Sequence, residues 1–456
     1  MTEDILRIRG GKPLCGEITV QGAKNSALPL MAAALLCEGE TVLHRVPQLS
    51  DVYAASRILN RLGCRCTAEG NTVSIRYSGS GSFEIPDADM RAMRSSIMFL
   101  GPILGRMRRC TLSMPGGCEL GPRPIDLHLA AMRQMGVKIC EEEGRIVCTA
   151  EKLRGTRIRL KLPSVGVTEN VMMAAVCAEG ETVLMNAARE PEIVDLARFL
   201  NQCGAKITGA GGSTVVISGG SPLTGTEYAV MPDRIAAVTY LCAGAAAGGS
   251  VSLSGVVPQH IESCTQVLEA AGCSITEHGG ILTLERTGGL KAVPYIETMP
   301  YPEFPTDAQA LLSAVLCIAE GRSIIRETIF DSRFKHVGAL REMGADIRVS
   351  GKKAEINGVS GLHGAAVAAT DLRAARPWPL QPLPQRARPI CGSCIILTGD
   401  MSILQKLSTV SAGMSGDADF LPKNGKIKAS GHELLKTLWK QCKTVEFRCG
   451  KRPVSA

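Results

Sequence analysis

The residues best suited to chemistry lie in one short stretch, residues 115–124, with the sequence PGGCELGPRP. Its three glycines and three prolines exclude a regular helix or central strand, because Gly removes the steric limit on φ and Pro removes a backbone donor. We therefore predict a loop. The planar guanidinium of Arg123 suits a phosphate or carboxylate, and a nearby cation favours the thiolate of Cys118. The alternative is a glycine-rich connector with a chance cysteine, since the chain has 18 cysteines.

Basic groups recur just before or at the start of other predicted helices. In residues 21–26 (QGAKNS), a glycine precedes a helix start and Lys24 lies in its first turn. Backbone donors and a charge at that place make an anion site. The alternative is an Asn or Ser helix cap beside a solvated lysine. Arg94, Arg123 and Arg333 occupy comparable places in later segments, and this recurrence favours a shared role over four unrelated surface charges.

Two carboxylates stand out at element ends. Asp307 lies where a helix is predicted to begin after two prolines, so it either stabilises the helix N-terminus or acts as a general base. Asp371 ends a predicted strand, and Arg373 is its natural partner in a structural ion pair. The seven histidines and the single C-x-x-C motif lack the spacing of a zinc site. The sequence contains no motif that is typical of nucleotide hydrolysis or of dinucleotide binding.

The elements that must position these groups form a repeat of roughly 70 residues. Each unit has an apolar helix, a turn such as EGET, a strand, an amphipathic helix followed by glycine, and a β-hairpin. The glycine is a helix C-terminal signal. The length of 456 residues favours two domains, and the pattern predicts an α/β fold. The apolar helices are expected at 28–36, 95–104, 171–178, 235–247 and 307–319, and the amphipathic ones at 52–62, 125–135, 192–202, 260–270 and 336–343.

A sixth unit is expected from residue 374 but is not recognisable. A proline-rich stretch replaces the buried helix, and both tryptophans lie beyond it. Residues 374–456 hold 13 basic and 5 acidic residues, which accounts for the whole net charge of +8. The neutral remainder has no electrostatic footprint for nucleic acid. We hypothesise that residues 374–456 are an aberrant basic tail, as if a reading frame had been lost; resequencing the coding region tests this.

The cellular compartment is predicted from two absences in the sequence. The N-terminus has no basic region followed by an apolar one, so no signal peptide is expected. The longest apolar runs, 27–37 and 235–249, fall short of the ~20 residues that a bilayer needs. Without an export signal, scattered cysteines are expected as reduced thiols. We therefore expect a cytoplasmic protein that does not associate with membranes.

Taken together, these motifs resemble the UDP-N-acetylglucosamine 1-carboxyvinyltransferase family of enolpyruvyl transferases, over residues 1 to about 373. The resemblance implies two similar globular domains of repeated β/α units, an inside-out α/β barrel fold, with a cleft between them. Residues 24–232 would form one domain with three repeats. Residues 1–23 and 233–373 would form the other, with its last repeat degenerate or lost. The motifs are GAKNSALP at 22–29, MRSS at 93–96, PGGC at 115–118, GPRPIDLH at 121–128, FPTD at 304–307 and RF at 333–334.

The resemblance also implies a reaction: transfer of the enolpyruvyl group of phosphoenolpyruvate to the 3′-hydroxyl of UDP-N-acetylglucosamine, with release of phosphate. This is the first committed step of peptidoglycan synthesis, and hence is linked to cell shape and division. Cys118 would donate a proton to the substrate and react with fosfomycin, Asp307 would be the base, and Lys24 a catalytic cation. No metal or organic cofactor is implied, and the oligomeric state stays open. The implied substrate contacts are Lys24, Asn25, Arg94, Arg123, Pro124, Ile125, Asp126, Leu127, Ser164, Val165, Asp307, Ile329, Arg333 and Asp371.

One departure from the family pattern affects activity. The resemblance implies a third phosphate-binding cation in the sixth repeat, and no equivalent follows Arg373. We therefore expect a feebly active, poorly soluble chain. The alternative function is an impaired remnant that binds nucleotide sugar without turnover. A shikimate-type transferase is disfavoured, because the region around Lys24 and the loop around Cys118 both fit the sugar-nucleotide family.

Overall fold

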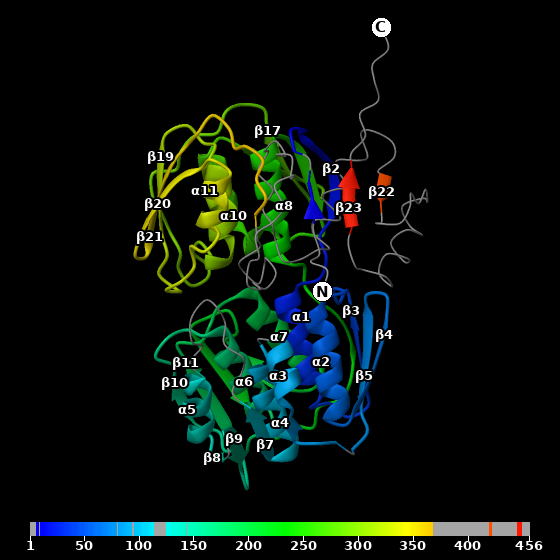
Figure 1. Cartoon of the computed structure of the whole chain (residues 1–456). Coiled ribbons are helices and arrows are strands. Elements are labelled where there is room, and N and C mark those ends of the chain that lie inside the picture. The colour runs from blue at the N-terminus through cyan, green and yellow to red at the C-terminus, as the bar shows by residue number, and fades with distance from the viewer. Residues whose placement is uncertain are drawn as a thin grey trace.

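The computed structural model describes residues 6–8, 10–79, 81–93, 95–113, 125–142, 144–367, 419–421 and 445–448. Within them the chain repeats one pattern of inner helix, strand, outer helix and hairpin (Figure 1). Six small sheets accompany the helices. The predicted α/β class is confirmed.

The first three units form the lower half of Figure 1. Nine of the eleven residues of helix α1 are buried, as expected for a helix that is apolar on all sides. The inner helices are α1 (Lys24–Ala34), α4 (Leu100–Met107) with the preceding 3-10 turn η1 (Ser96–Phe99), and α6 (Val165–Ala175). The outer helices are α2 (Ser50–Arg61), α5 (Asp126–Gln134) and α7 (Pro191–Gln202), and a short helix α3 (Asp87–Ala92) precedes η1.

Each sheet in this half contains a strand from a neighbouring unit. The last of these strands, β14 (Glu227–Ala229), returns to pair in parallel with β3 (Glu40–His44) of the first unit. The three units therefore close into a ring. The other strands are β4 (Cys64–Glu69), β5 (Thr72–Tyr77), β6 (Glu84–Ile85), β7 (Arg109–Ser113), β8 (Lys138–Glu142), β9 (Arg145–Thr149), β10 (Arg157–Arg159), β11 (Glu181–Met185), β12 (Lys206–Thr208) and β13 (Thr214–Ser218).

Two further units form the upper half of Figure 1. The inner helices are α8 (Arg234–Ala247) and α10 (Gln309–Leu316), the latter preceded by the 3-10 turn η3 (Thr306–Ala308). The outer helices are α9 (Glu262–Ala270), after the 3-10 turn η2 (Pro258–His260), and α11 (Val337–Glu342). The strands are β2 (Leu14–Thr19), β15 (Gly249–Ser254), β16 (Ser274–His278), β17 (Ile281–Arg286), β18 (Ile296–Glu297), β19 (Arg322–Arg326), β20 (Asp346–Ser350) and β21 (Lys353–Asn357).

The sixth sheet takes two strands from the C-terminal region. β1 (Leu6–Arg7) pairs in parallel with β23 (Val445–Arg448), which pairs antiparallel with β22 (Asp419–Leu421). Most of residues 374–456 lie outside the described ranges. The hypothesis that this tail is not the native continuation of the fold therefore stays a prediction.

The two halves have separate hydrophobic cores, and the chain crosses between them twice. One core draws on residues 27–230, and the other on residues 18–20 and 236–362. The crossing segments are hydrogen-bonded to each other, with the Ala23 N–H 2.7 Å from the Met231 carbonyl oxygen. A Cβ on Gly22 would lie 1.9 Å from the Arg45 carbonyl oxygen, so only glycine fits there. The crossing places the starts of α1 and α8 side by side.

The C-terminal ends of the helices agree with the prediction from the sequence more closely than their N-terminal ends do. The glycines after all five outer helices have positive φ, from +90° to +111°, as predicted for a C-terminal signal. Helix α1, however, begins four residues before its apolar pattern. Asp233, from the second crossing, accepts the Lys24 N–H and satisfies a donor of the first turn. In the described part of the chain, no helix has both the length and the apolar character needed to span a bilayer.

Candidate functional site

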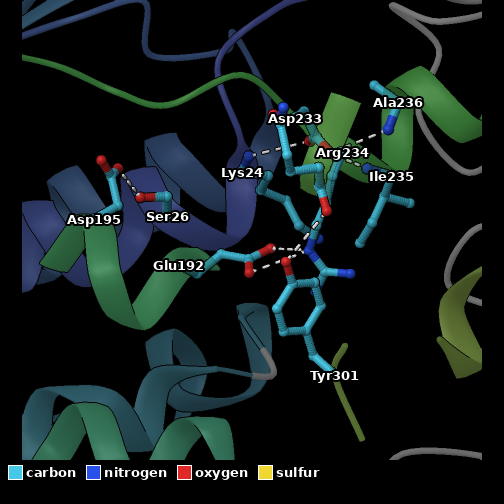
Figure 2. A network of polar contacts seen from close by, with 10 residues as sticks. Lys24, Ser26, Glu192, Asp195, Asp233, Arg234, Ile235, Ala236 and Tyr301 are labelled. Atoms are coloured by element: carbon cyan, nitrogen blue, oxygen red, sulfur yellow. Dashed lines mark hydrogen bonds and ion pairs between the residues drawn. The ribbon is translucent and has the colours of Figure 1, made fainter. Parts of the chain in front are cut away.

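The start of α1 carries the first predicted site residues. Lys24 donates its backbone N–H to Asp233 Oδ2 at 3.3 Å, and its Nζ lies 3.1 Å from Asp51 Oδ2. The alternative of an Asn or Ser cap is wrong, because the N-cap residue is Ala23 and both polar residues lie inside the helix. One of them, Ser26, donates its hydroxyl to Asp195 of α7 (Figure 2). Lys24 is therefore fixed at its backbone, and its ammonium group is only half-buried.

The pairing of Lys24 with Asp51 predicts an effect on anion binding. Their side chains are 38% and 27% exposed, and an ion pair of this kind contributes about 0–1 kcal/mol. We expect Asp51→Asn to lower the KM for an anionic substrate by roughly two- to fivefold, since Lys24 no longer has to leave a carboxylate. Steady-state titration of the anionic substrate at low and high salt measures this. Asp87→Asn, which breaks the exposed Asp87–Arg91 pair, is the control. A higher KM in Asp51→Asn would refute the prediction.

The start of α10 carries a second group of site residues. Arg333 Nη2 lies 2.8 Å from Asp307 Oδ1. The arginine side chain is only 8% exposed, and its guanidinium carbon lies 5.4 Å from the centre of the Phe330 ring. Asp307 is more open, at 23%. The carboxylate therefore has a fixed orientation and still has access to solvent.

A buried glutamate holds this second group in place. Glu327, which is 1% exposed, accepts the Thr306 hydroxyl at 2.8 Å and the N–H groups of Ile329 and Phe330 at 2.8 and 3.1 Å. One carboxylate thus fixes both the turn that carries Asp307 and the loop that carries Ile329. Sequence reasoning missed Glu327, because a glutamate after a strand has no distinctive spacing.

A buried ion pair connects the two groups. Arg234 follows Asp233 at the start of α8, and its Nε lies 2.9 and 3.2 Å from the two carboxylate oxygens of Glu192 on α7 (Figure 2). Burial opposes the charge of Arg234, but Glu192 and then Asp307 outweigh burial and raise its pKa. Arg234 and Asp307 also line one cavity. The starts of α1, α7, α8 and α10 therefore meet at one place. Arg234 and Glu192 were missed from the sequence, where neither lies in a recognised motif.

Five further described site residues lie at two neighbouring helix starts. Ile125, Asp126 and Leu127 open α5, and Ser164 and Val165 open α6, which packs against α5. Ser164 caps its helix by accepting the Val167 N–H at 3.5 Å. Ile125 is buried and Asp126 is exposed, while Ile329 on its own loop is a 39% exposed apolar side chain. Five predicted site residues lie outside the described ranges, and their placement stays a prediction: Arg94, Cys118, Arg123, Pro124 and Asp371.

Comparison with known proteins gives the family. The model of the EPSP synthase (3-phosphoshikimate 1-carboxyvinyltransferase) family matches residues 8–379. UDP-N-acetylglucosamine 1-carboxyvinyltransferase 2 of Caldanaerobacter subterraneus subsp. tengcongensis is 48% identical over 367 residues, covering 80% of this chain and 88% of that protein. UDP-N-acetylglucosamine 1-carboxyvinyltransferase of Nitratidesulfovibrio vulgaris is 47% identical over 373 residues, covering 82% and 89%.

Solved structures agree in fold. The enolpyruvyl transferase NikO from Streptomyces tendae superposes with a TM-score of 0.69 at 22% identity, covering 77% of this chain and 83% of that one. EPSP synthase from Acinetobacter baumannii gives 0.61 at 20% identity, covering 78% and 84%. The solved structures, at 20–22% identity, support the fold alone, whereas the relatives at 47–48% identity show which family within this fold the chain resembles. The chain therefore belongs to the UDP-N-acetylglucosamine 1-carboxyvinyltransferase family of enolpyruvyl transferases.

Proposed function

We propose that this chain transfers the enolpyruvyl group of phosphoenolpyruvate to the 3′-hydroxyl of UDP-N-acetylglucosamine and releases phosphate, the first committed step of peptidoglycan synthesis. The observation that carries the proposal is the position of Asp307. Its carboxylate is held by the buried Arg333 and shares a cavity with Arg234, next to the crossing that orients Lys24. A base and cations thus meet where the two halves of the chain join.

The anionic substrate is assigned to the start of α1. Phosphoenolpyruvate carries a phosphate and a carboxylate, and the Lys24 ammonium and the Asn25 amide supply a cation and a neutral donor for them. Arg123 and Arg94 are proposed as further cations. Cys118 is proposed to protonate C3 of the enol while C2 is attacked, and a thiol that exchanges protons at this place also reacts with fosfomycin.

The acceptor hydroxyl is assigned to Asp307. As the oxygen attacks C2 it loses its proton, and a carboxylate in hydrogen-bonding reach takes that proton. Arg333 and the turn anchored by Glu327 keep the carboxylate from rotating away. The exposed Ile329 offers an apolar surface beside it. The helix starts at Ile125–Leu127 and Ser164–Val165 are proposed to hold the nucleotide sugar, with Asp371 at the edge of the site.

A phosphate-release assay on the purified full chain tests the proposal. We expect release only when phosphoenolpyruvate and UDP-N-acetylglucosamine are both present, and none with shikimate 3-phosphate as the acceptor. The rate should fall about 10²–10³-fold below that of a relative with an intact sixth repeat, the loss typical of one missing charge-stabilising donor. Cys118→Ala should abolish both release and tritium exchange into C3 of phosphoenolpyruvate. Binding of the nucleotide sugar without any release or exchange would refute the proposed activity.

A further inference from the structure

His260 connects two cavities of different size at the junction of the two halves. The smaller cavity, of about 10 Å³, is lined by Asp307, Arg234 and His260, with apolar side chains of α8 and α10 around them. This volume suits the centre of one water molecule. The larger cavity, of about 340 Å³, is open to solvent. Among the residues that the structure describes, His260 lines both.

The imidazole of His260, which lines the smaller cavity, has a buried nitrogen that is able to accept a proton. Its Nδ1 atom is buried and has no hydrogen-bond partner in the described part of the chain. Such an atom is costly to bury unless water or a proton donor reaches it. Burial lowers the pKa of His260, so near neutral pH the ring is uncharged and one nitrogen can accept.

Several charged groups face His260, and they oppose one another. Glu192 and Asp195 of α7 favour its charged form, whereas Arg234 of α8 and Arg198 of α7 disfavour it. Asp307 lines the smaller cavity with it, and Arg189 and Tyr301 line the larger one with it. Arg234 and Tyr301 are labelled in Figure 2. The ring therefore lies among fixed charges of both signs, where its charge can change without leaving a lone buried ion.

We propose that His260 is a relay residue that carries the acceptor's proton from Asp307 to solvent. The inference rests on the proposed function, because it begins with Asp307 as the base. The hydroxyl O–H bond breaks, its electron pair forms the new C–O bond, and the proton goes to the Asp307 carboxylate. The carboxylic acid passes a proton through a water in the smaller cavity to His260 Nδ1. The imidazolium then turns about its Cβ–Cγ bond, releases the same Nδ1 proton into the larger cavity, and turns back with Nε2 still protonated.

The first test does not depend on turnover. The NMR titration of His260, assigned with His260→Gln, is compared between the unmodified chain and Asp307→Asn. We expect the midpoint to fall when the Asp307 charge is removed, since an opposite charge nearby favours the charged form. The exposed His278 on β16 should not shift. An unchanged His260 midpoint would overturn the relay.

The second test is kinetic. His260→Gln should lower kcat for phosphate release about tenfold with KM within about twofold, since proton transfer by a positioned group contributes about 10²–10⁴-fold and solvent supplies part of the route. Added imidazole should restore the rate, and the solvent isotope effect on kcat should rise. His278→Gln is the matched control. A normal His260→Gln rate beside an inactive Asp307→Asn would overturn the relay and leave the proposed function standing. Absence of phosphate release from the unmodified chain would overturn the function, and the titration alone would then decide on the relay.

Discussion

Replacing Asp307 by Asn lowers the rate of phosphate release by about 10²–10⁴-fold, the range that a positioned general base contributes. The amide keeps the size of the side chain and can still accept from Arg333, but it cannot take a proton from a hydroxyl. The KM for both substrates should change little, because Thr306 and Glu327 still hold the turn. Steady-state phosphate release, with circular dichroism as a check on folding, measures the effect.

A nearby exposed aspartate provides the control for this substitution. Asp331 is 84% exposed and pairs with Lys352, away from the cavity that Asp307 lines. Asp331→Asn removes the same charge a short distance away and should leave kcat within about twofold, as expected for an exposed pair. If both variants lose activity equally, the loss comes from removing a negative charge at either position, and Asp307 is not the base.

Replacing Glu192 by Gln destabilises the protein by about 3–5 kcal/mol, the cost of leaving one member of a buried ion pair uncompensated. The Glu192 and Arg234 side chains are only 3% and 8% exposed. The guanidinium would then lie buried beside Asp307 without its nearest counter-ion. Chemical denaturation, monitored by circular dichroism, gives the free energy of unfolding. Because the pair joins α7 to α8, the contact between the two halves should loosen first.

Two variants distinguish the energetic cost of an uncompensated buried charge from that of losing a single ion pair. The double variant Glu192→Leu with Arg234→Met removes both charges and should recover most of the stability, since apolar pairs of similar volume replace buried ion pairs well. Glu84→Gln breaks the half-exposed Glu84–Arg145 pair and should cost less than about 1 kcal/mol. A double variant that is less stable than Glu192→Gln alone would contradict this account.

The local pattern of the sequence was sufficient to predict the repeating unit. The positive φ of the glycines after the outer helices follows from a single residue type at a helix end. The inner helices were recognisable because they are apolar on all sides. Their starts were not, since α1 is extended by Asp233 from a segment 209 residues away. The hydrophobic periodicity also did not predict the 3-10 turn at 306–308.

The predicted site residues gained most of their partners from distant segments. Sequence motifs pointed to Lys24, Asp307 and Arg333, and the family resemblance gave them roles. No motif pointed to Glu192, Arg234 or Glu327, which hold or connect them. Each is a single charged residue at the end of a helix or strand, and charged residues in proteins are mostly exposed on the surface. Only burial against an opposite charge distinguishes them.

The sequence by itself determined the repeat, the α/β class and the family, because these depend on local periodicity and on short motifs that survive without knowledge of the fold. The tertiary structure decided how the units close on each other and which groups meet. β14 completes the ring by pairing with β3, and the crossing at Gly22 brings the starts of α1 and α8 together. The physical reason is that contacts between units depend on packing and chain crossing, which no local pattern encodes. The cavity shared by Asp307, Arg234 and His260 exists only through that packing.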